Sequence, residues 1–455
     1  MLAQPNKLDT SKAAERARRR EAATEGNPSR SCRLVQLYRG LSKLGPGIVT
    51  GASDDDPSGI ATYSQVGARF GFAMLWTMPY LYPLMSGVQE ISAWVGRVTG
   101  AGIAANIRRY YSAWVLYPMV TLLLIANVIN LGADLCAMGS ALTLMVGGPS
   151  HFYTVVFGAL SVAAAIFIPY SKYARLLKWA SLVLLVYVAT AVVVHVPLRS
   201  VLSNSFIPTF SVSTSYMTSL TAVFGTTISP YLFVWQASQE VQEQRAAPDE
   251  TALKLAPEQA DSQLRPMRVD TYTGMAFSNL IAFFIILDTA AVLHAHGRTN
   301  IQTATQAAEA LRPFAGDLSF ALFSLGIVGT GLLAVPVLAG SAGYALAEAL
   351  NWPIGLDRKF LRAKGFYSTL AVATLLGLSL NFTSIDPLTA LFWSAVINGV
   401  VAVPFMFMMM LMTANPRVTG SMKLPLWPKI IGWISTAIMS VVAIGMIATW
   451  NRSGG

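Results

Sequence analysis

The stretch that decides the fold runs from residue 45 to residue 59 and reads Gly45-Pro46-Gly47-Ile48-Val49-Thr50-Gly51-Ala52-Ser53-Asp54-Asp55-Asp56-Pro57-Ser58-Gly59. It places three consecutive carboxylates, a proline and a glycine inside the first long apolar segment. A carboxylate at the centre of a bilayer costs about 2.5–3.5 kcal/mol on insertion scales, so three together need a physical reason. Two interpretations are open: a solvated loop, or a helix broken at membrane depth whose carbonyls and acids line a cation site.

The composition of the whole chain is that of a membrane protein. Of its 455 residues 54% are hydrophobic and 12% are charged, whereas about 25% of the residues of a soluble domain are charged. The mean hydropathy of +0.52 and many apolar runs of about 20 residues predict an all-α integral membrane protein with many spans. We find no nucleophile–base arrangement, phosphate-binding loop or cofactor motif, so we expect neither an enzyme nor a bound cofactor.

The apolar pattern predicts eleven transmembrane spans. We place them at residues 44–67, 72–95, 113–144, 152–170, 175–196, 216–243, 267–293, 316–350, 366–381, 385–413 and 428–449. Residues 1–43 read as a disordered basic tail, and residues 450–455 as a short C-terminal tail. The polar stretch 244–266 reads as a loop that includes at most a short helix.

The distribution of Lys and Arg gives the expected orientation. With the N-terminus inside, 27 of the 32 basic residues fall in the tail and the inside loops, and five fall outside. This asymmetry follows the positive-inside rule and accounts for the net charge of +10 without a nucleic-acid partner. We therefore expect a multi-pass protein of the plasma or inner membrane, in contact with the lipid bilayer, with its N-terminus cytoplasmic and its C-terminus outside.

A second interruption lies in the sixth span, at Gly225-Thr226-Thr227-Ile228-Ser229-Pro230-Tyr231. Proline removes a backbone donor, and Gly, Ser and Thr tolerate the bend, so each interruption leaves carbonyls that need a partner. A first and a sixth span broken alike predict two inverted five-helix repeats, about 44–196 and 216–413, with an extra helix at about 428–449. Acids at one break favour a cation, and oxygen donors without His or Cys favour Mg²⁺, Mn²⁺ or Ca²⁺.

At these residues the chain resembles the NRAMP family of divalent-metal transporters, over nearly all of 44–449. The resemblance is carried by residues 45–71, by Leu75-Trp76, by Gln89-Glu90-Ile91-Ser92-Ala93 and by Val98-Thr99-Gly100. It implies eleven or twelve spans in the fold of the bacterial leucine transporter. It also implies movement of Mn²⁺ or Fe²⁺ together with protons.

The resemblance assigns roles at the first break, where the family has Asp-Pro-Gly-Asn. Asp56 and Pro57 match the family's Asp and Pro, whereas Ser58 replaces the Gly and Gly59 replaces the metal-binding Asn. In the third helix Asp134 matches an acid of the family's proton path. Ala137 stands where that path has a Glu.

At the second break the family has Met-Pro-His, with the Met sulfur on the metal. Ser229 replaces the Met, Pro230 matches, and Tyr231 replaces the His. Thr226 stands where a carbonyl ligand is expected, and we expect Thr226 and Ser229 to act mainly through their backbone oxygens. Loss of the thioether removes a preference for softer transition metals, which is similar to the NRAMP-related magnesium transporter branch.

The candidate residues fall into two groups. The expected metal ligands are Asp56, Thr226, Ser229, Gly59 and Asp55. The expected residues of the permeation path or the surroundings of the metal are Asp54, Tyr231, Asp134, Glu240 and Asn398.

The preferred hypothesis is alternating-access import of Mg²⁺ at an oxygen-only site. Its alternative is a proton-coupled Mn²⁺/Fe²⁺ transporter, although the missing His and Glu leave no obvious proton relay. An alternative of another class is a membrane sensor or scaffold that binds partners through its tail and the 244–266 loop. Transport of amino acids is disfavoured, because three aspartates would repel a substrate carboxylate.

Overall fold

The computed structural model describes residues 50–453 apart from residues 52, 169–180, 195, 357–359 and 384. The basic tail 1–43, all of residues 171–178, which include three basic residues counted as inside, and the last two residues lie outside this part of the chain. Among the described residues the regular elements are α-helices and short 3₁₀-helices, with no strand.

The helices follow the expected repeats in chain order. The first set is α4 (Pro57–Phe70), α5 (Thr77–Thr99), α6 (Ile103–Tyr110), α7 (Ala113–Val146), α8 (Ser150–Phe167) and α10 (Leu185–Val193). A connecting helix, α11 (Leu198–Phe206), follows. The second set is α12 (Thr214–Thr227), α13 (Pro230–Ala246), α14 (Ala260–Val292), α15 (Ala304–Ala308), α16 (Arg312–Ala315), α17 (Ser319–Ala349), α18 (Lys364–Ser379) and α19 (Pro387–Ala414). The chain ends with α20 (Pro416–Thr419) and α21 (Leu426–Ser453).

Eight helical segments of the described chain are long and apolar enough to cross a membrane. They include α12 and α13 taken together, and α15 to α17 taken together. The other three expected spans correspond to α4 with the helical residues just before it, to α5, and to the shorter apolar helix Leu182–Val193. In the first span the break at Asp55 and Asp56 leaves α4 with 14 residues, which is too short for one helix to cross a membrane.

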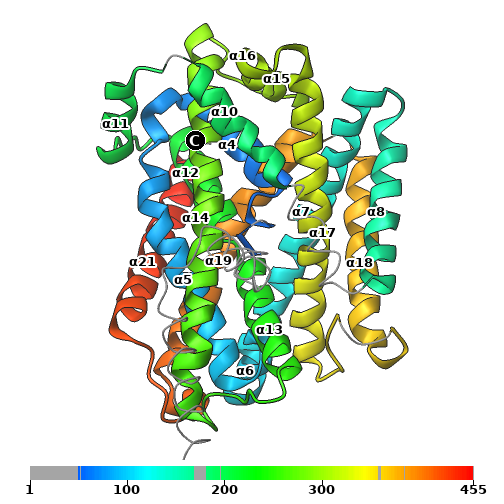
Figure 1. Ribbon diagram of the computed structural model, residues 1–455, viewed down its shortest axis with the longest axis vertical. Coiled ribbons are helices and arrows are strands. Elements are labelled where there is room, and N and C mark those ends of the chain that lie inside the picture. The colour runs from blue at the N-terminus through cyan, green and yellow to red at the C-terminus, as the bar shows by residue number, and fades with distance from the viewer. Residues whose placement is uncertain are drawn as a thin grey trace, which may run out of the picture. The chain divides into compact units, whose positions relative to one another are not determined.

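The helices pack as two sets around the breaks. The long helices α7 and α17, the third of each repeat, pack against each other, and α8 and α18 lie side by side beyond them (Figure 1). On the other side of the bundle α21 packs against α5, α12 and α19. The short helix α4 is enclosed by α7, α12, α14 and α19, so both breaks lie in the interior.

The polar stretch 244–266 differs from the expectation of a loop with at most a short helix. The loop is only about residues 247–256, and α14 begins at Ala260, within the stretch that the hydropathy pattern excluded from the seventh span. Pro266 lies inside α14 and Asp261 lies in its first turn. The helix begins before the apolar segment because polar side chains stay solvated there. Hydropathy therefore marks the part of the helix that lies in the membrane and not the residue at which the helix begins.

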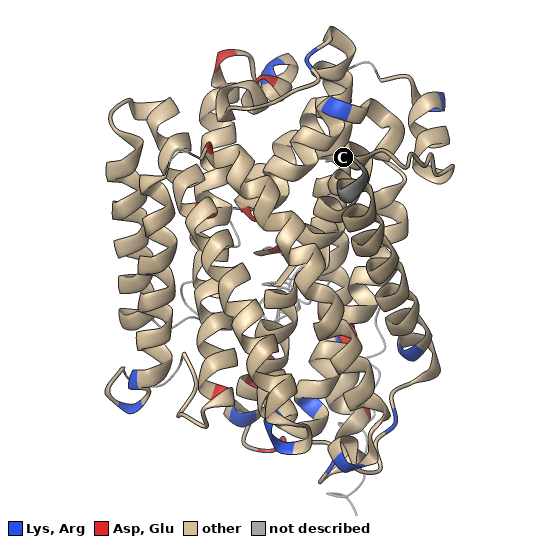
Figure 2. Cartoon of the chain, turned by 180° about the vertical axis from the view of Figure 1, so that it is seen from behind, with Lys and Arg blue, Asp and Glu red and all other residues tan. Residues whose placement is uncertain are grey.

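Basic residues gather at one end of the bundle. Figure 2 shows most of the described Lys and Arg at the end that holds α6 and the last turn of α13, with fewer at the opposite end. The last helix, α21, runs from that basic end to the opposite end (Figure 1). We therefore expect the basic end to face the cytoplasm.

Candidate functional site

The first break is an interruption of the helix directly before α4. Residues 50–51 and 53–54 are helical, Asp55 is a bend, and Asp56 is extended, with φ −67° and ψ 170°. Asp56 is the N-cap of α4: its Oδ1 accepts hydrogen bonds from the Gly59 amide at 2.8 Å and from Ser58 Oγ at 2.6 Å. Pro57 occupies the first helical position, where its missing N–H leaves nothing unsatisfied. The sequence Asp-Pro thus stops one helix and starts the next at membrane depth.

The other oxygen of Asp56 joins three helices. Its Oδ2 accepts from Tyr231 Oη at 3.1 Å and from Asn130 Nδ2 at 3.2 Å. Asn130 also donates to Asp134 Oδ2 at 3.2 Å, and its own Oδ1 accepts from Asn398 Nδ2 at 3.1 Å. Four residues expected at the site, from α7, α13, α19 and the first break, therefore meet around Asn130.

The second break lies between α12 and α13, at Ile228 and Ser229. The Ser229 hydroxyl lies 2.7 Å from the Gly225 carbonyl oxygen and 2.9 Å from the Thr226 carbonyl oxygen, and its single hydrogen can be donated to one of them at a time. Gly225 lies against the backbone of α19, where an added Cβ would be 2.0 Å from the Ala395 carbonyl oxygen. This break is therefore tightly packed and electrically neutral.

The two breaks face each other at Gly59. A Cβ added there would lie 3.3 Å from both the Asp54 carbonyl oxygen and Thr226 Oγ1. Tyr63, one turn further along α4, contacts Thr227 Oγ1 through its hydroxyl at 2.9 Å. The absence of a side chain at Gly59 thus brings oxygens of the two broken helices to the same point.

Asp54 and Asp55 both contact α14. Asp54 Oδ2 lies 2.6 Å and Asp55 Oδ1 lies 3.1 Å from the same hydroxyl, Ser278 Oγ. A serine hydroxyl carries a single hydrogen, so it can donate to only one of the two carboxylates at a time. Both aspartates are buried, at 1% and 0% exposure, and the pair is therefore poorly compensated.

Several side-chain oxygens at the breaks and on the helices beside them have no hydrogen-bond partner. Within the described chain they are Asp54 Oδ1, Asp55 Oδ2, Asp134 Oδ1, Thr226 Oγ1 and Asn398 Oδ1. Buried polar atoms are nearly always hydrogen-bonded, and a group of acceptors without donors is what a cation would satisfy. All five belong to residues that the sequence nominated.

The donor set contains oxygen alone. Among the described residues no three His, Cys, Asp or Glu side chains are grouped to hold a metal ion by themselves. Hydroxyl, amide and carbonyl oxygens would have to complete any coordination shell. Oxygen donors of this kind suit hard divalent cations.

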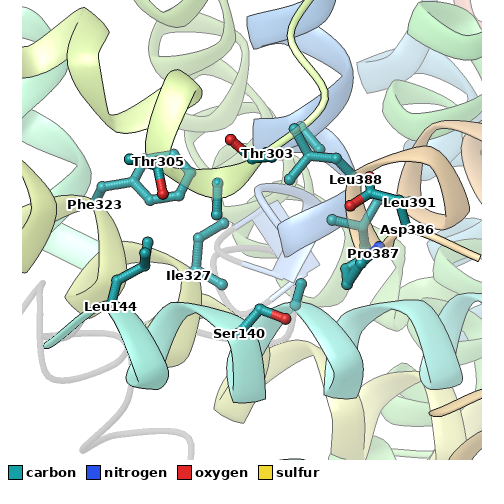
Figure 3. A pocket seen from close by; sticks show the side chains of 13 residues that line it. Ser140, Leu144, Thr303, Thr305, Phe323, Ile327, Asp386, Pro387, Leu388 and Leu391 are labelled. Carbon is teal, nitrogen blue, oxygen red and sulfur yellow. The ribbon is translucent and has the colours of Figure 1, made fainter. Parts of the chain in front are cut away.

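A cavity leads toward the site from the end opposite the basic one. Its volume is about 200 Å³, and its lining residues come from α4, α7, α15, α17, the start of α19 and the residues just before α15 and α19. Figure 3 shows Thr303 and Asp386 on one side of it and Ser140 of α7 on another. The α4 residue in the lining is Ala61, two positions after Gly59.

Glu240 lies apart from the other candidates. It is on α13 beyond the second break, where its carboxylate accepts from Arg97 Nε at 2.6 Å and from Gln236 Nε2 at 2.7 Å. Among the described residues its carboxylate makes no hydrogen bond with Asp56 or with Asn130. Its expected place on the permeation path remains a prediction.

Two residues of the site were not nominated from the sequence. Asn130 links Asp56, Asp134 and Asn398, and Ser278 contacts Asp54 and Asp55. Asn130 stands one helical turn before Asp134 in an otherwise apolar helix, and this i, i+4 spacing could have singled it out. Ser278 offers no such signal, because small hydroxyl residues are common in membrane helices.

Comparison with known families decides where this fold belongs. Residues 47–449 match the family model described as natural resistance-associated macrophage protein-like, Nramp. The chain belongs to the Nramp family. The match covers both broken helices and all of the spans described above.

Curated Nramp relatives align along most of their length with this Nramp chain. The divalent metal cation transporter MntH of Klebsiella pneumoniae is 25% identical over 430 residues, which cover 91% of this chain and 95% of the relative. The protein of the same name from Deinococcus radiodurans is 25% identical over 425 residues, 92% of each chain. These relatives are transporters and not enzymes.

Solved structures share the fold. The manganese transporter of Eremococcus coleocola superposes with a TM-score of 0.70 at 18% identity, over 91% of this chain and 87% of the other. MhsT in complex with L-phenylalanine superposes with a TM-score of 0.60 at 11% identity, over 90% and 98%. The expected leucine-transporter-like architecture with broken first and sixth helices is thereby confirmed.

Proposed function

We propose that this Nramp protein moves a divalent metal cation across the membrane by alternating access. The observation that carries the proposal is that five buried side-chain oxygens of residues at the two facing breaks and on the neighbouring helices α7 and α19 have no hydrogen-bond partner. Broken helices at the midplane of a repeat interface are where transporters of this architecture bind substrates and ions. The curated relatives named divalent metal cation transporters support the same substrate class.

Manganese is the first ion to consider. The structural relative from Eremococcus coleocola is a manganese transporter, and no relative that we compared is named for magnesium. The comparisons therefore favour the proton-coupled Mn²⁺/Fe²⁺ alternative over the magnesium hypothesis that the sequence suggested. Magnesium stays a second candidate for one reason: Ser229 supplies no sulfur, so the donors around the breaks are all oxygens.

The residues suggest how a cation would be held. Asp56 Oδ2 receives its hydrogen bonds from side chains of α7 and α13, so an arriving cation would take the place of these donors. Thr226 Oγ1 and the Asp54 carbonyl, which face each other across Gly59, are the nearest neutral oxygens. Asp134 and Asn398 would add negative charge and an amide oxygen behind Asn130. Each contact joins a helix break to a neighbouring helix, so binding would couple ion occupancy to helix positions.

Uptake into proteoliposomes that contain the full-length protein tests the proposal. We expect saturable Mn²⁺ uptake that is accelerated when the compartment containing the metal is made acidic, as proton coupling requires. If a large excess of Mg²⁺ suppresses this uptake and Mg²⁺ itself accumulates, magnesium is a substrate too. If Mn²⁺ uptake proceeds unchanged in excess Mg²⁺, the magnesium hypothesis is refuted. The absence of uptake of either ion would refute the transporter proposal.

A further inference from the structure

A chain of buried polar side chains joins the first helix to α13 on the basic side of the two breaks. It consists of Thr50, Gln236, Glu240 and Arg97, which we call the polar chain. Thr50 Oγ1 donates to Gln236 Oε1, Gln236 Nε2 donates to Glu240 Oε1 at 2.7 Å, and Arg97 Nε donates to Glu240 Oε2 at 2.6 Å. These four side chains come from three elements: the helical residues before the first break, α13 and α5.

The order of donors and acceptors in the polar chain is fixed from its charged end. A carboxylate can only accept, so Glu240 must receive the amide N–H of Gln236. The amide oxygen of Gln236 then necessarily faces Thr50, and the threonine hydroxyl must donate to it. Glu240 therefore determines which atom Gln236 presents to the first helix, although Glu240 itself does not touch that helix.

Arg97 anchors the polar chain at the basic end. Besides Glu240, its guanidinium pairs with Glu250 at 2.6 Å and with Glu243. Its backbone carbonyl accepts from the Leu253 amide at 3.0 Å, so the loop after α13 is bound to the end of α5. Arg97 is 5% exposed, and a buried arginine with several carboxylates is held in one position by charge-assisted hydrogen bonds.

The two sides of the breaks differ in access. On the side away from the basic end, the 200 Å³ cavity reaches Ala61 of α4. On the basic side, Thr50 and Gln236 are both 0% exposed and in contact. Thr50 lies one helical turn before Asp54, and Gln236 lies less than two turns after Pro230, so their contact lies directly behind the breaks.

From these observations we propose that Glu240 is a positioning residue, which orients Gln236 so that Gln236 holds Thr50 and keeps the path to the basic end closed. The proposal rests on the transport function proposed above. Opening toward the basic end then requires the Thr50–Gln236 contact to break, while the ion pairs of Arg97 with Glu240, Glu243 and Glu250 stay intact. The Thr50–Gln236 hydrogen bond joins two neutral side chains, so breaking this contact does not by itself unpair a buried charge.

Hydrogen–deuterium exchange of residues 50–56 tests this in the full-length protein in nanodiscs, without metal. We expect Thr50→Val, Gln236→Leu and Glu240→Gln each to speed exchange in this segment by about tenfold, as loss of one buried hydrogen bond would. Thr50→Ser keeps the hydroxyl and should exchange like the wild type. Gln239→Leu is the matched control, because Gln239 is also on α13 but donates to Tyr344 of α17, and it should leave residues 50–56 unchanged.

Two results would overturn the proposal. One is wild-type exchange of residues 50–56 in Thr50→Val. The other is equal acceleration in Gln239→Leu and Gln236→Leu, which would indicate general loosening of α13. Because exchange is measured without metal, these outcomes do not depend on whether the protein transports an ion.

A kinetic measurement distinguishes a positioning role of these residues from a merely structural one. In proteoliposomes Gln236→Leu should raise the KM for metal on the cavity side several-fold, since a smaller fraction of the protein faces that side. Thr50→Ser should retain the wild-type KM. A fall in maximal rate with unchanged KM would contradict the positioning role.

Discussion

The two helix breaks pose the same backbone problem and solve it with different chemistry. At the first break Asp56 caps α4 with one carboxylate oxygen and receives donors from α7 and α13 with the other. At the second break the Ser229 hydroxyl bonds to the carbonyls at the end of α12, and no charged side chain takes part. A carboxylate at a break can exchange its hydrogen-bond partners for a ligand. A break whose carbonyls bond to a neighbouring hydroxyl has no charge to offer a ligand and serves to bend and pack the helix. The difference leads us to propose the first break as the main site of ion binding.

The largest effect is expected from removing the charge of Asp56 while keeping its cap. Asn caps helices about as well as Asp, so Asp56→Asn should unfold at nearly the wild-type temperature. Its uptake should fall by more than about 100-fold, beyond the 10–100-fold typical for residues behind a metal ligand. Proteoliposome uptake and thermal unfolding, measured side by side, check this. Wild-type uptake by Asp56→Asn would remove the functional difference between the two breaks.

The second largest effect is expected from two glycine substitutions, which compare the space available for a side chain at the two breaks. Gly225→Ala places a Cβ 2.0 Å from a backbone oxygen of α19, which should destabilise the protein by about 3 kcal/mol. Gly59→Ala places its Cβ 3.3 Å from Asp54 O and Thr226 Oγ1. We expect nearly unchanged stability but an uptake KM raised several-fold, because the methyl group stands between candidate ligands.

Thermal unfolding and uptake kinetics of the two glycine variants give the comparison directly. Equal losses of stability would contradict our conclusion that the backbone is packed more tightly at Gly225 of the second break than at Gly59 of the first.

The smallest effect is expected from the hydroxyl of Ser229. Ser229→Ala removes the hydroxyl that donates to the Gly225 or the Thr226 carbonyl at the end of α12 and should destabilise the protein by about 1 kcal/mol. Uptake should stay within about twofold of the wild type, since the backbone oxygens at the break are kept. If uptake falls as far as in Asp56→Asn, the result would instead indicate that the Ser229 hydroxyl is a metal ligand.

Much of the architecture could be predicted because the bilayer imposes simple rules on a sequence. Long apolar runs give the spans, and Asp56-Pro57 and Ser229-Pro230 give the breaks, since proline cannot continue the backbone pattern. The beginning of α14 was harder to predict, because hydropathy reports the membrane and not the helix. Among the candidate residues, Asp134, Tyr231 and Asn398 do meet around Asp56 through Asn130.

The sequence by itself determined the membrane class, the two breaks and the acid at the first of them, because these follow from local composition. Only the tertiary structure decided which way each acid points. Asp54 and Asp55 turn to Ser278, more than 220 positions away, and Glu240 pairs with Arg97, 143 positions away. The physical reason is that a buried polar group is satisfied by whichever helix packs against it, and the pattern of one helix carries no record of its neighbour.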